Sequence, residues 1–331
     1  MKTPFARLTA ALVTASLALS ACAAAAPPAP AAPAATATSS KPALGTAANP
    51  LVMSLAPSAT AQELIASGDL IAKLVTDKTG YVIKTNVPTS YAALVEAMGS
   101  GNAHIGWLPP LAYILAQKKN AADVAMATIR TGSDHYGVQF LANASSGFKP
   151  FFDEKANKST TEKPEEALKQ FEGKKACWTD KLSASGYVVP SGILLRAKIT
   201  TTEPIFANNH PTVARNLYNK AGCDFGATYN DVRTQDKSLA ELTDITSKVV
   251  VIWRTPEFIP NDNVSYAKSM PKDMRDKLTK AFLEVAVTPE GKAALTKVYT
   301  IDGLKAVDDT FYDEFRSTLE ATGLDVTTLV K

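Results

Sequence analysis

Segments typical of strands alternate with segments typical of amphipathic helices along most of the chain. The short apolar runs LVMSLAP at 51–57 and VAMATI at 124–129 favour buried strands, whereas SYAALVEAM at 90–98 has apolar residues at helical spacing. The alternation starts again with EEALKQF at 165–171 and continues to about residue 255. Such alternation predicts mostly parallel sheets covered on both faces by helices, and two runs of it predict two doubly wound α/β lobes.

Two β-rich runs lie where the pattern of one lobe gives way to that of the other. YGVQFLA occupies 136–142 and KVVVIWRT occupies 248–255. We interpret these runs as two crossover strands of a hinge. The first lobe then comprises 49–141 plus 256–331, and the second lobe comprises 142–255. An α/β chain with two crossovers can close a cleft around a ligand by hinge motion.

The amino-terminal segment is typical of a secretory leader. Lys2 and Arg7 are basic, 8–18 is an uncharged and mostly apolar run, and small residues follow. The tetrapeptide Leu-Ser-Ala-Cys at 19–22 resembles the lipobox of bacterial lipoproteins, which implies cleavage after residue 21 and lipid attachment to Cys22. The alternative is an ordinary leader with an incidental cysteine.

Residues 22–48 are rich in Ala, Pro, Thr and Ser, and Leu44 is their one large apolar residue. Such a segment cannot bury enough apolar surface to fold, and its prolines favour extended backbone. We expect a tether that holds a folded domain off a membrane, on the extracytoplasmic face of the cell membrane. The later sequence has no stretch long and apolar enough for a transmembrane helix.

The charge balance and the cysteine content limit the possible binding partners and covalent links of the chain. The chain has 35 Lys and Arg against 32 Asp and Glu, and two of the basic residues lie in the leader. This balance gives no reason to expect a nucleic-acid partner. Besides Cys22 there are Cys177 and Cys223, and an even number of cysteines outside the cytoplasm favours one disulfide over two buried thiols. The strands near these cysteines would be neighbours in the common 2-1-3 strand order.

The segment DKLSASGY at 180–187 follows a predicted strand and precedes a predicted helix. Ligands bind at the carboxyl ends of strands in open α/β sheets, and the first amides of a helix attract anions. Ser183 and Ser185 add hydroxyl donors, and Ala184 and Gly186 leave room for a ligand. Taken alone, the segment could equally be the serine N-cap of a structural helix.

Several stretches together resemble the phosphate-, phosphite- and phosphonate-binding proteins of ABC importers. They occur in the family's order and cover most of 50–310: TSYAALVEAMGSGNAHIGWLPPLAYILA, SASGYVVPSG, NNHPTVARNLYNKAGCDFGATYND, VVVIWRTPEFIPND and PEGKAALTKVYTIDGL. The resemblance implies the type II periplasmic-binding-protein fold, an oxyanion pocket between the lobes, and a membrane permease as partner.

Carried over onto this chain, the family's ligand contacts are Tyr91, Tyr113, Ser183, Ala184, Ser185, His210 and Asp231. The chain departs from the family around the histidine, where it has Asn208, Asn209 and Pro211. Each contact has a simpler alternative: the two tyrosines could be packing residues, and Asp231 could be a helix N-cap. Trp107 and Tyr229 are expected to pack near the pocket rather than to bind the ligand.

Asp231 would also explain a choice between anions. An ionised carboxylate only accepts hydrogen bonds, so a ligand facing it must keep a proton. Monoprotonated phosphate, phosphite and phosphonates can donate from P–OH, whereas sulfate cannot. We therefore expect Asp231 to discriminate against sulfate.

Other chemistry has little support. His104, His135 and His210 are far apart, so no zinc-ligand spacing occurs, and no nucleophile elbow or phosphate-binding loop is present. The alternatives are a binding or sensor domain for another small anion and a cleft hydrolase using Ser185, His210 and Asp231. We expect no enzymatic activity, no cofactor and no metal. The expected function is that of a monomeric solute-binding lipoprotein for a phosphorus oxyanion.

Overall fold

The computed structural model describes residues 42–58 and 61–321. The expected leader, Cys22 and the expected tether up to residue 41 lie outside these residues. The last seven residues of the expected tether, from Pro42, are described, and Leu44 packs against the core. Among the described helices, none combines the length and the apolar character that crossing a membrane requires.

One lobe is built on a six-stranded sheet with the order β15-β4-β14-β3-β1-β2. β1 pairs in parallel with β2 and β3, whereas β14 and β15 are antiparallel to their neighbours. Its strands are β1 (Leu51–Leu55), β2 (Ile83–Asn86), β3 (Ile105–Leu108), β4 (Ala122–Ile129), β14 (Asn263–Ala267) and β15 (Gly303–Ala306).

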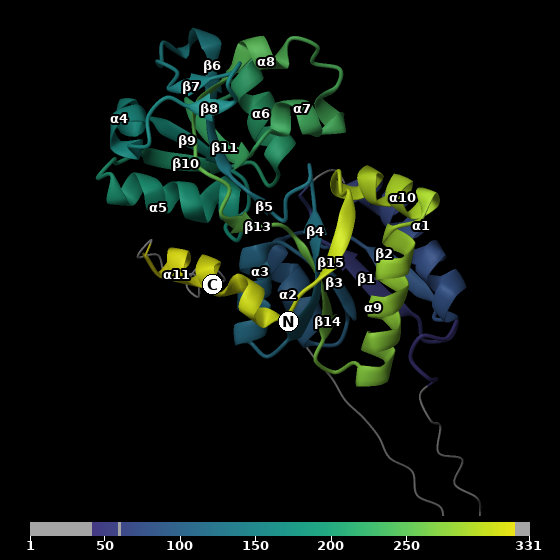
Figure 1. Ribbon diagram of the computed structural model, residues 1–331. Helices are drawn as coiled ribbons and strands as arrows, with labels where there is room; N and C mark the ends of the chain where they lie inside the picture. The colour runs from purple at the N-terminus through teal and green to yellow at the C-terminus, as the bar shows by residue number, and fades with distance from the viewer. Residues whose placement is uncertain (1–41, 59–60, 322–331) are drawn as a thin grey trace, which may run out of the picture. The chain divides into compact units, whose positions relative to one another are not determined.

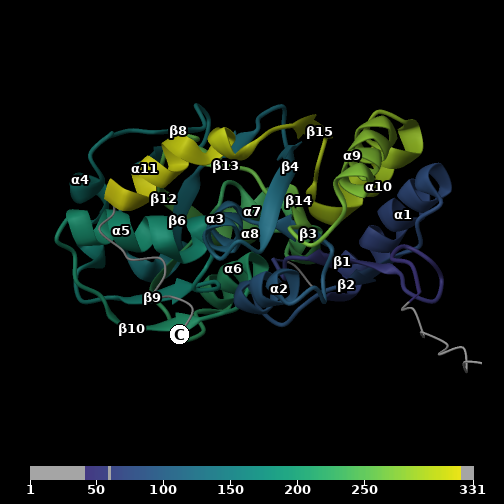
Figure 2. The same ribbon diagram turned by 90° about the horizontal axis from the view of Figure 1, so that it is seen from below.

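Helices cover both faces of this sheet. α2 and α3 lie on one face, and α1, α9 and α10 pack together on the other (Figures 1 and 2). Their bounds are α1 (Ala61–Thr79), α2 (Tyr91–Gly99), α3 (Pro110–Lys118), α9 (Lys272–Ala286) and α10 (Pro289–Tyr299). Beyond β15, the described part of the chain continues through η5 (Asp309–Tyr312) and α11 (Asp313–Ala321).

The other lobe is built on a five-stranded sheet with the order β10-β9-β11-β6-β12. β6 is antiparallel to β11 and β12, and β9 is parallel to β10 and β11. Its strands are β6 (Val138–Asn143), β9 (Lys175–Trp178), β10 (Thr202–Phe206), β11 (Phe225–Tyr229) and β12 (Val249–Arg254).

This lobe also has helices on both faces, together with a small hairpin. The helices are η1 (Ala144–Ser146), α4 (Pro164–Leu168), η2 (Lys169–Phe171), η3 (Ala184–Val188), α5 (Val189–Arg196), α6 (His210–Asn219), α7 (Val232–Gln235), η4 (Lys237–Leu239) and α8 (Ile245–Lys248). The hairpin is β7 (Phe152–Asp153) with β8 (Lys158–Ser159).

The predicted two-lobe α/β architecture is confirmed, but the crossovers lie elsewhere than expected. The run at 136–142 forms most of β6 and the run at 248–255 contains β12, and both strands belong to the five-stranded sheet. The chain instead passes between the sheets at β5 (His135–Tyr136) and β13 (Ile259–Pro260), which pair antiparallel. β6 and β12 are long and apolar because they are buried in a sheet, and length alone does not identify a crossover.

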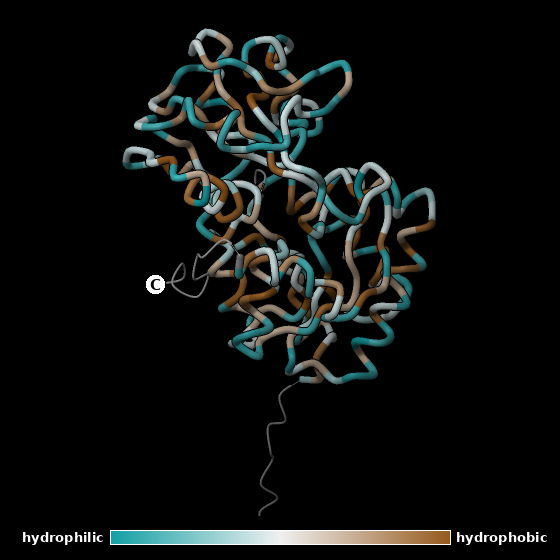
Figure 3. Tube along the Cα trace, turned by 60° about the vertical axis from the view of Figure 1, so that its left-hand side comes forward, coloured by the Kyte–Doolittle hydropathy of each residue, from teal (hydrophilic) through white to brown (hydrophobic). Residues whose placement is uncertain are grey.

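The core of the second lobe is divided by its sheet. Phe140 packs with the cluster beneath α4 and α5, and the next residue, Leu141, packs with the cluster beneath α6. Successive strand residues point to opposite faces, so β6 supplies both layers. In the Cα trace of Figure 3, hydrophobic (brown) and hydrophilic (teal) stretches follow one another along the chain.

The structure contains the expected disulfide between Cys177 and Cys223. Cys177 lies in β9, and Cys223 lies two residues before β11. β9 stands between β10 and β11, which is the 2-1-3 order assumed from the sequence. The two Cα atoms are 5.7 Å apart, a separation that a disulfide accepts without displacing the backbone.

Candidate functional site

The segment at 180–187 forms a tight turn after β9. The Asp180 carboxylate accepts a hydrogen bond from Leu182 N at 2.7 Å, and Ser183 Oγ caps η3 by accepting from Gly186 N at 3.1 Å. A Cβ atom on Gly186 would lie 1.9 Å from Thr179 Oγ1. The glycine therefore permits close packing of the helix on the end of the strand, rather than close approach of a ligand.

η3 continues into α5, so Ala184 and Ser185 form the first turn of one helical run. Such positions have amide N–H groups without partners inside the helix. Ser183, Ala184 and Ser185 are at most 3% exposed, and all three line a cavity. Within the described residues, Ser185 Oγ has no hydrogen bond of ordinary length. These groups together form a set of donors directed at an acceptor.

His210 is the first residue of α6 and lies beside the serines. Its Nε2 is 3.5 Å from Ser183 Oγ, and its ring contacts that of Tyr229 with centroids 4.8 Å apart. Asn209 caps the helix by accepting from Thr212 N, and Pro211 stands where a helix tolerates proline. The residues that depart from the family pattern thus build an ordinary helix start.

The imidazole of His210 is neutral. Burial and, secondarily, the positive charge of Arg130 lower the pKa of His210 to about 3. Its Nδ1 has no hydrogen-bond partner among the described residues. A neutral imidazole donates from one nitrogen and accepts at the other, so His210 can donate one hydrogen bond to an anion.

Four tyrosines surround these donors. Tyr91 begins α2, Tyr136 lies in β5, Tyr229 ends β11 and Tyr299 ends α10, and all four line the cavity. Burial raises the pKa of each phenol, so every hydroxyl stays protonated at neutral pH. The Tyr299 hydroxyl already donates to Ala56 O at 2.7 Å, and that of Tyr229 donates to Asp236 Oδ2 at 3.5 Å.

A buried ion pair completes the wall on the side of the six-stranded sheet. Arg130 follows β4 directly, and its Nη2 donates to Asp262 Oδ2 at 2.6 Å. Burial alone would lower the pKa of Arg130, but Asp262 together with Tyr229, Tyr136 and Tyr299 outweighs burial and raises it. Arg130 Nε has no partner within the described chain.

The cavity has a volume of about 410 Å³ and is lined from both lobes. Its buried part contains hydroxyl, imidazole and guanidinium donors, and its outer part includes the exposed residues Glu63, Lys237 and Lys297. Pockets for small ligands have this character, an enclosed space with a few convergent polar groups. The arrangement is suited to a small anion.

Five of the seven expected contacts line this cavity, namely Tyr91, Ser183, Ala184, Ser185 and His210. Tyr113 does not, and its assignment needs correction. It is buried in α3, its hydroxyl donates to Asp309 Oδ1 at 2.6 Å, and its ring packs on Tyr312. The helix that follows β3 faces the core here, so Tyr113 ties α3 to η5.

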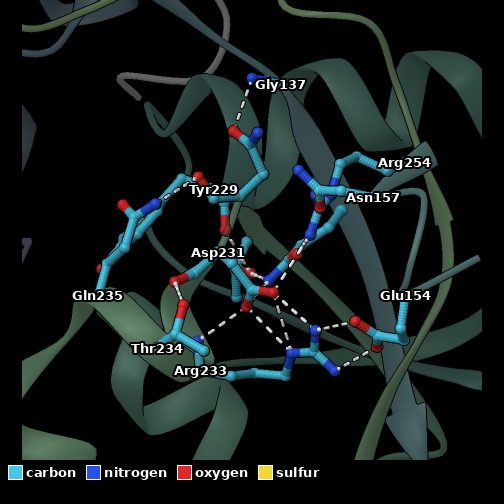
Figure 4. A network of polar contacts seen from close by, with 12 residues as sticks. Gly137, Glu154, Asn157, Tyr229, Asp231, Arg233, Thr234, Gln235 and Arg254 are labelled. Carbon is cyan, nitrogen blue, oxygen red and sulfur yellow. Dashed lines mark hydrogen bonds and ion pairs between the residues drawn. The ribbon is translucent and has the colours of Figure 1, made fainter. Parts of the chain in front are cut away.

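Asp231 also lies outside the cavity lining, and this assignment is corrected too. Its carboxylate accepts from Arg233 Nη2 at 2.6 Å, from Gln139 Nε2 at 3.0 Å and from Arg254 Nη2 at 3.2 Å (Figure 4). It also caps α7 by accepting from Arg233 N. The alternative considered from sequence, a helix N-cap, describes it better.

Burial alone would raise the pKa of Asp231, but hydrogen bonding and charge from Arg233 outweigh burial and lower it. Arg233 also pairs with Glu154, and Arg254 also donates to Asn157 (Figure 4). The carboxylate is therefore committed to arginines, and none of its hydrogen bonds is to His210. Ser185, His210 and Asp231 do not form a triad.

Sequence reasoning missed Arg130, Tyr136 and Asp262, and it took Tyr229 for a packing residue. A usable signal existed for Arg130, because it stands at the carboxyl end of a predicted strand, where α/β proteins bind ligands. Asp262 lies in a loop whose neighbours are set only by the pairing of β14 with β4. In the described residues, no group of three or more His, Cys, Asp or Glu side chains is placed to hold a metal ion.

Comparison with known proteins decides the family. Residues 53–312 match the model of the ABC transporter, phosphonate, periplasmic substrate-binding proteins. The chain belongs to this phosphonate-binding family. It is thus a periplasmic substrate-binding protein of an ABC transporter and acts outside the cytoplasm.

Two known proteins are each about one quarter identical in sequence to this phosphonate-binding protein. The phosphate-import protein PhnD of Mycolicibacterium smegmatis is 25% identical over 310 residues, which is 86% of this chain and 90% of the relative. The phosphonates-binding periplasmic protein of Escherichia coli K12 is 24% identical over 226 residues, which is 67% of this chain and 62% of the relative.

Solved structures share the type II fold. A binding protein component of an ABC phosphonate transporter from Pseudomonas aeruginosa superposes with a TM-score of 0.67 at 18% identity, covering 84% of this chain and 96% of that one. PhnD1 from Prochlorococcus marinus, in complex with methylphosphonate, gives a TM-score of 0.69 at 15% identity, covering 81% and 96%.

Proposed function

We propose that this protein captures a small phosphorus oxyanion, either phosphate, phosphite or a phosphonate, in the cavity between its lobes and delivers it to a membrane permease. The observation that supports this most directly is the convergence of Ser185 Oγ, His210 Nδ1 and Arg130 Nε on one cavity, each without a hydrogen bond of ordinary length in the described chain. Buried polar groups are normally paired, so three such groups in one place call for a ligand that accepts hydrogen bonds.

The ligand-binding residues in this proposal are Tyr91, Ser183, Ala184, Ser185 and His210, joined by Arg130, Tyr136 and Tyr229. The serines and helix amides would hold the oxyanion on one side, and Arg130 would balance its charge on the other. The relative from M. smegmatis, which imports phosphate, and the P. marinus protein crystallised with methylphosphonate support the choice of phosphorus.

The same proposal covers the protein's place in the cell. We expect it to act as a monomer without catalytic activity, anchored to the outer side of the cell membrane through a lipid on Cys22. We also place the hinge at β5 and β13, because the chain passes between the two sheets there. Closure of the lobes would bring both walls of the cavity onto the ligand.

A thermal-shift screen tests the proposed function. Phosphate, phosphite, hypophosphite, methylphosphonate, 2-aminoethylphosphonate and sulfate are each added to the mature protein. A ligand at 100 times its dissociation constant stabilises the folded state by ~2.7 kcal/mol, which raises the melting temperature measurably. The expected result is a shift with at least one phosphorus anion. A shift with sulfate alone, or with none of them, would contradict the proposal.

A further inference from the structure

The cation and the buried carboxylate of the cavity are bonded to each other. Arg130 Nη2 and Asp262 Oδ2 are 2.6 Å apart, and their side chains are 19% and 12% exposed. Both residues line the cavity. The Asp262 carboxylate accepts this hydrogen bond from Arg130, so its charge is already engaged before a ligand arrives.

The backbone holds this pair in place. Arg130 follows β4 and Asp262 precedes β14, and these two strands are antiparallel neighbours. Thr128 N donates to Asp262 O at 2.9 Å, and the Asn261 side-chain amide donates to the carbonyls of Thr128 and Ser133. The pair is therefore built into the sheet rather than formed by two mobile surface side chains.

Arg130 retains donors for a ligand. Its Nε has no partner within the described residues, and its guanidinium lies 5.4 Å from the centre of the Tyr299 ring. Its charge also reaches the opposite wall, since it contributes to the lowered pKa of His210. An anion in the cavity thus meets a guanidinium that is paired with Asp262 on one side and has its Nε–H left to donate.

A positively charged substituent on the ligand would meet the opposite situation. An ammonium group needs a free carboxylate, and Asp262 is occupied by Arg130. The two other acids of the lining offer less: Glu63 is exposed, and the Asp236 carboxylate accepts hydrogen bonds from Ser238 and, at 3.5 Å, from Tyr229. In the buried part of the cavity the ammonium would instead be repelled by Arg130.

We propose that Arg130 is a specificity-determining residue, which makes the site select phosphorus anions without a cationic substituent over aminoalkylphosphonates. This inference rests on the proposed function and narrows its substrate class. Inorganic phosphate, phosphite and alkylphosphonates are accepted, and the ammonium-bearing analogues are rejected by Arg130 together with its engagement of Asp262.

Two probes of nearly equal shape test this directly. Propylphosphonate and 2-aminoethylphosphonate differ in a terminal methyl against an ammonium group. Calorimetry of the wild-type protein at pH 7 should show propylphosphonate binding at least about tenfold more tightly, because like charges repel strongly where water is excluded. Equal binding, or tighter binding of 2-aminoethylphosphonate, overturns the inference whatever the variants do.

The variant Arg130→Met assigns the effect to this residue. It removes the repulsion and frees Asp262 for an ammonium group, so the preference for propylphosphonate should disappear or reverse while propylphosphonate itself binds more weakly. Lys297→Met is the matched control, since it removes an exposed cation from the same cavity lining. It should leave the ratio of the two affinities unchanged.

A wild-type ratio retained in folded Arg130→Met would assign the selection to another group and overturn the proposal. Arg130→Lys keeps a charge at the site and should keep the preference, which guards against a methionine variant that fails to fold. Failure of the proposed function looks different. Neither probe, nor phosphate, nor phosphite would then bind the wild type, and both proposals would fall together.

Discussion

At the scale of single residues, Ser185 offers the cleanest test of ligand contact. Its hydroxyl is buried in the cavity wall without an ordinary hydrogen bond in the described chain, so removing it costs the folded protein little. A hydrogen bond to a charged group contributes about 1.5–3 kcal/mol. Ser185→Ala should therefore weaken binding of the phosphorus anion roughly tenfold to hundredfold, as measured by calorimetry.

The control for that measurement is Ser191→Ala. Ser191 lies in α5 on the same helical run, its hydroxyl donates to the Tyr187 carbonyl, and it does not line the cavity. It should leave affinity unchanged. Equal affinities of Ser185→Ala and the wild type would reduce the serine turn to a plain helix start.

The lowered pKa of His210 predicts how the stability of the folded protein depends on pH. Its folded pKa of about 3 lies below the ordinary value of 6.5, so below pH 6.5 the unfolded chain takes up a proton that the folded protein does not. This group contributes nothing above pH 6.5 and destabilises progressively below it. Between pH 6.5 and pH 5 it should cost about 2 kcal/mol of unfolding free energy.

Urea unfolding at several pH values measures the effect of His210. The variant His210→Gln should lose this part of the pH dependence while other groups keep theirs. The same slope in variant and wild type over this window would show that His210 is protonated in the folded protein, and the neutral donor assigned to it would be wrong.

At the scale of elements, Asp231 joins α7 to β12 by pairing with Arg233 and Arg254. Removing one partner from a buried ion pair leaves the other charge uncompensated, which costs roughly 3 kcal/mol or more. Asp231→Asn should destabilise the protein by about that amount in denaturant unfolding, while leaving the discrimination between phosphorus anions and sulfate unchanged. If Asp231→Asn discriminated less between phosphorus anions and sulfate than the wild type does, Asp231 would have to contact the ligand.

Glu154→Gln is the matched control for Asp231. Glu154 pairs with the same Arg233, but its side chain is 56% exposed. Exposed ion pairs contribute about 0–1 kcal/mol, so this variant should lose little stability. A loss as large as that of Asp231→Asn would mean that Arg233, rather than the carboxylate at the cap, holds the network together.

The disulfide is a second prediction at this scale. Cys177 and Cys223 are separated by 46 positions, and closing a loop of this size stabilises a folded protein by about 2–4 kcal/mol. The double variant with serine at both positions should lose that much in urea unfolding and retain ligand affinity, because backbone pairing of β9 with β11 persists. Identical unfolding of the variant and of the oxidised wild type would show that the bridge does not form in the protein.

The elements also show where sequence reasoning stops. Long apolar runs identified nearly all the strands and the strand order around β9, because burial in a sheet leaves a local pattern. β5 and β13 have two residues each and no such pattern, since their pairing is made by the rest of the fold. β15 is a similar case, because its pairing with β4 is also made by the rest of the fold.

The residues of the site also differ in whether the sequence alone could identify them. The serine turn and His210 are recognisable because each occupies the start of a helix, where a local motif marks it. Asp262 could not be told from Asp231 by sequence, because each follows a strand-like run and only the sheet order decides which one meets Arg130.

At the scale of the whole molecule, the anchor is the prediction to test. Cys22 lies outside the described residues, and its lipid is proposed from the Leu-Ser-Ala-Cys motif. Cys22→Ser should move the protein from washed membranes into the soluble extracytoplasmic fraction with unchanged ligand affinity, because the cavity is lined by residues from Ser58 onward. Fractionation with immunoblotting measures this. A variant that still sediments after a carbonate wash would exclude the lipid as the means of attachment.

The position of β14 has a consequence for how the chain is assembled. β14 lies between β3 and β4, yet it is synthesised after all five strands of the other sheet. A chain that emerges amino end first from the ribosome or an export channel therefore leaves β3 and β4 with unpaired edges until residue 267 has followed. The inserted lobe has all its strands by then and can close first. The six-stranded sheet can therefore pair β14 with β3 and β4 only after the strands of the five-stranded sheet have been synthesised. The ion pair between Arg130 and Asp262 cannot form before then.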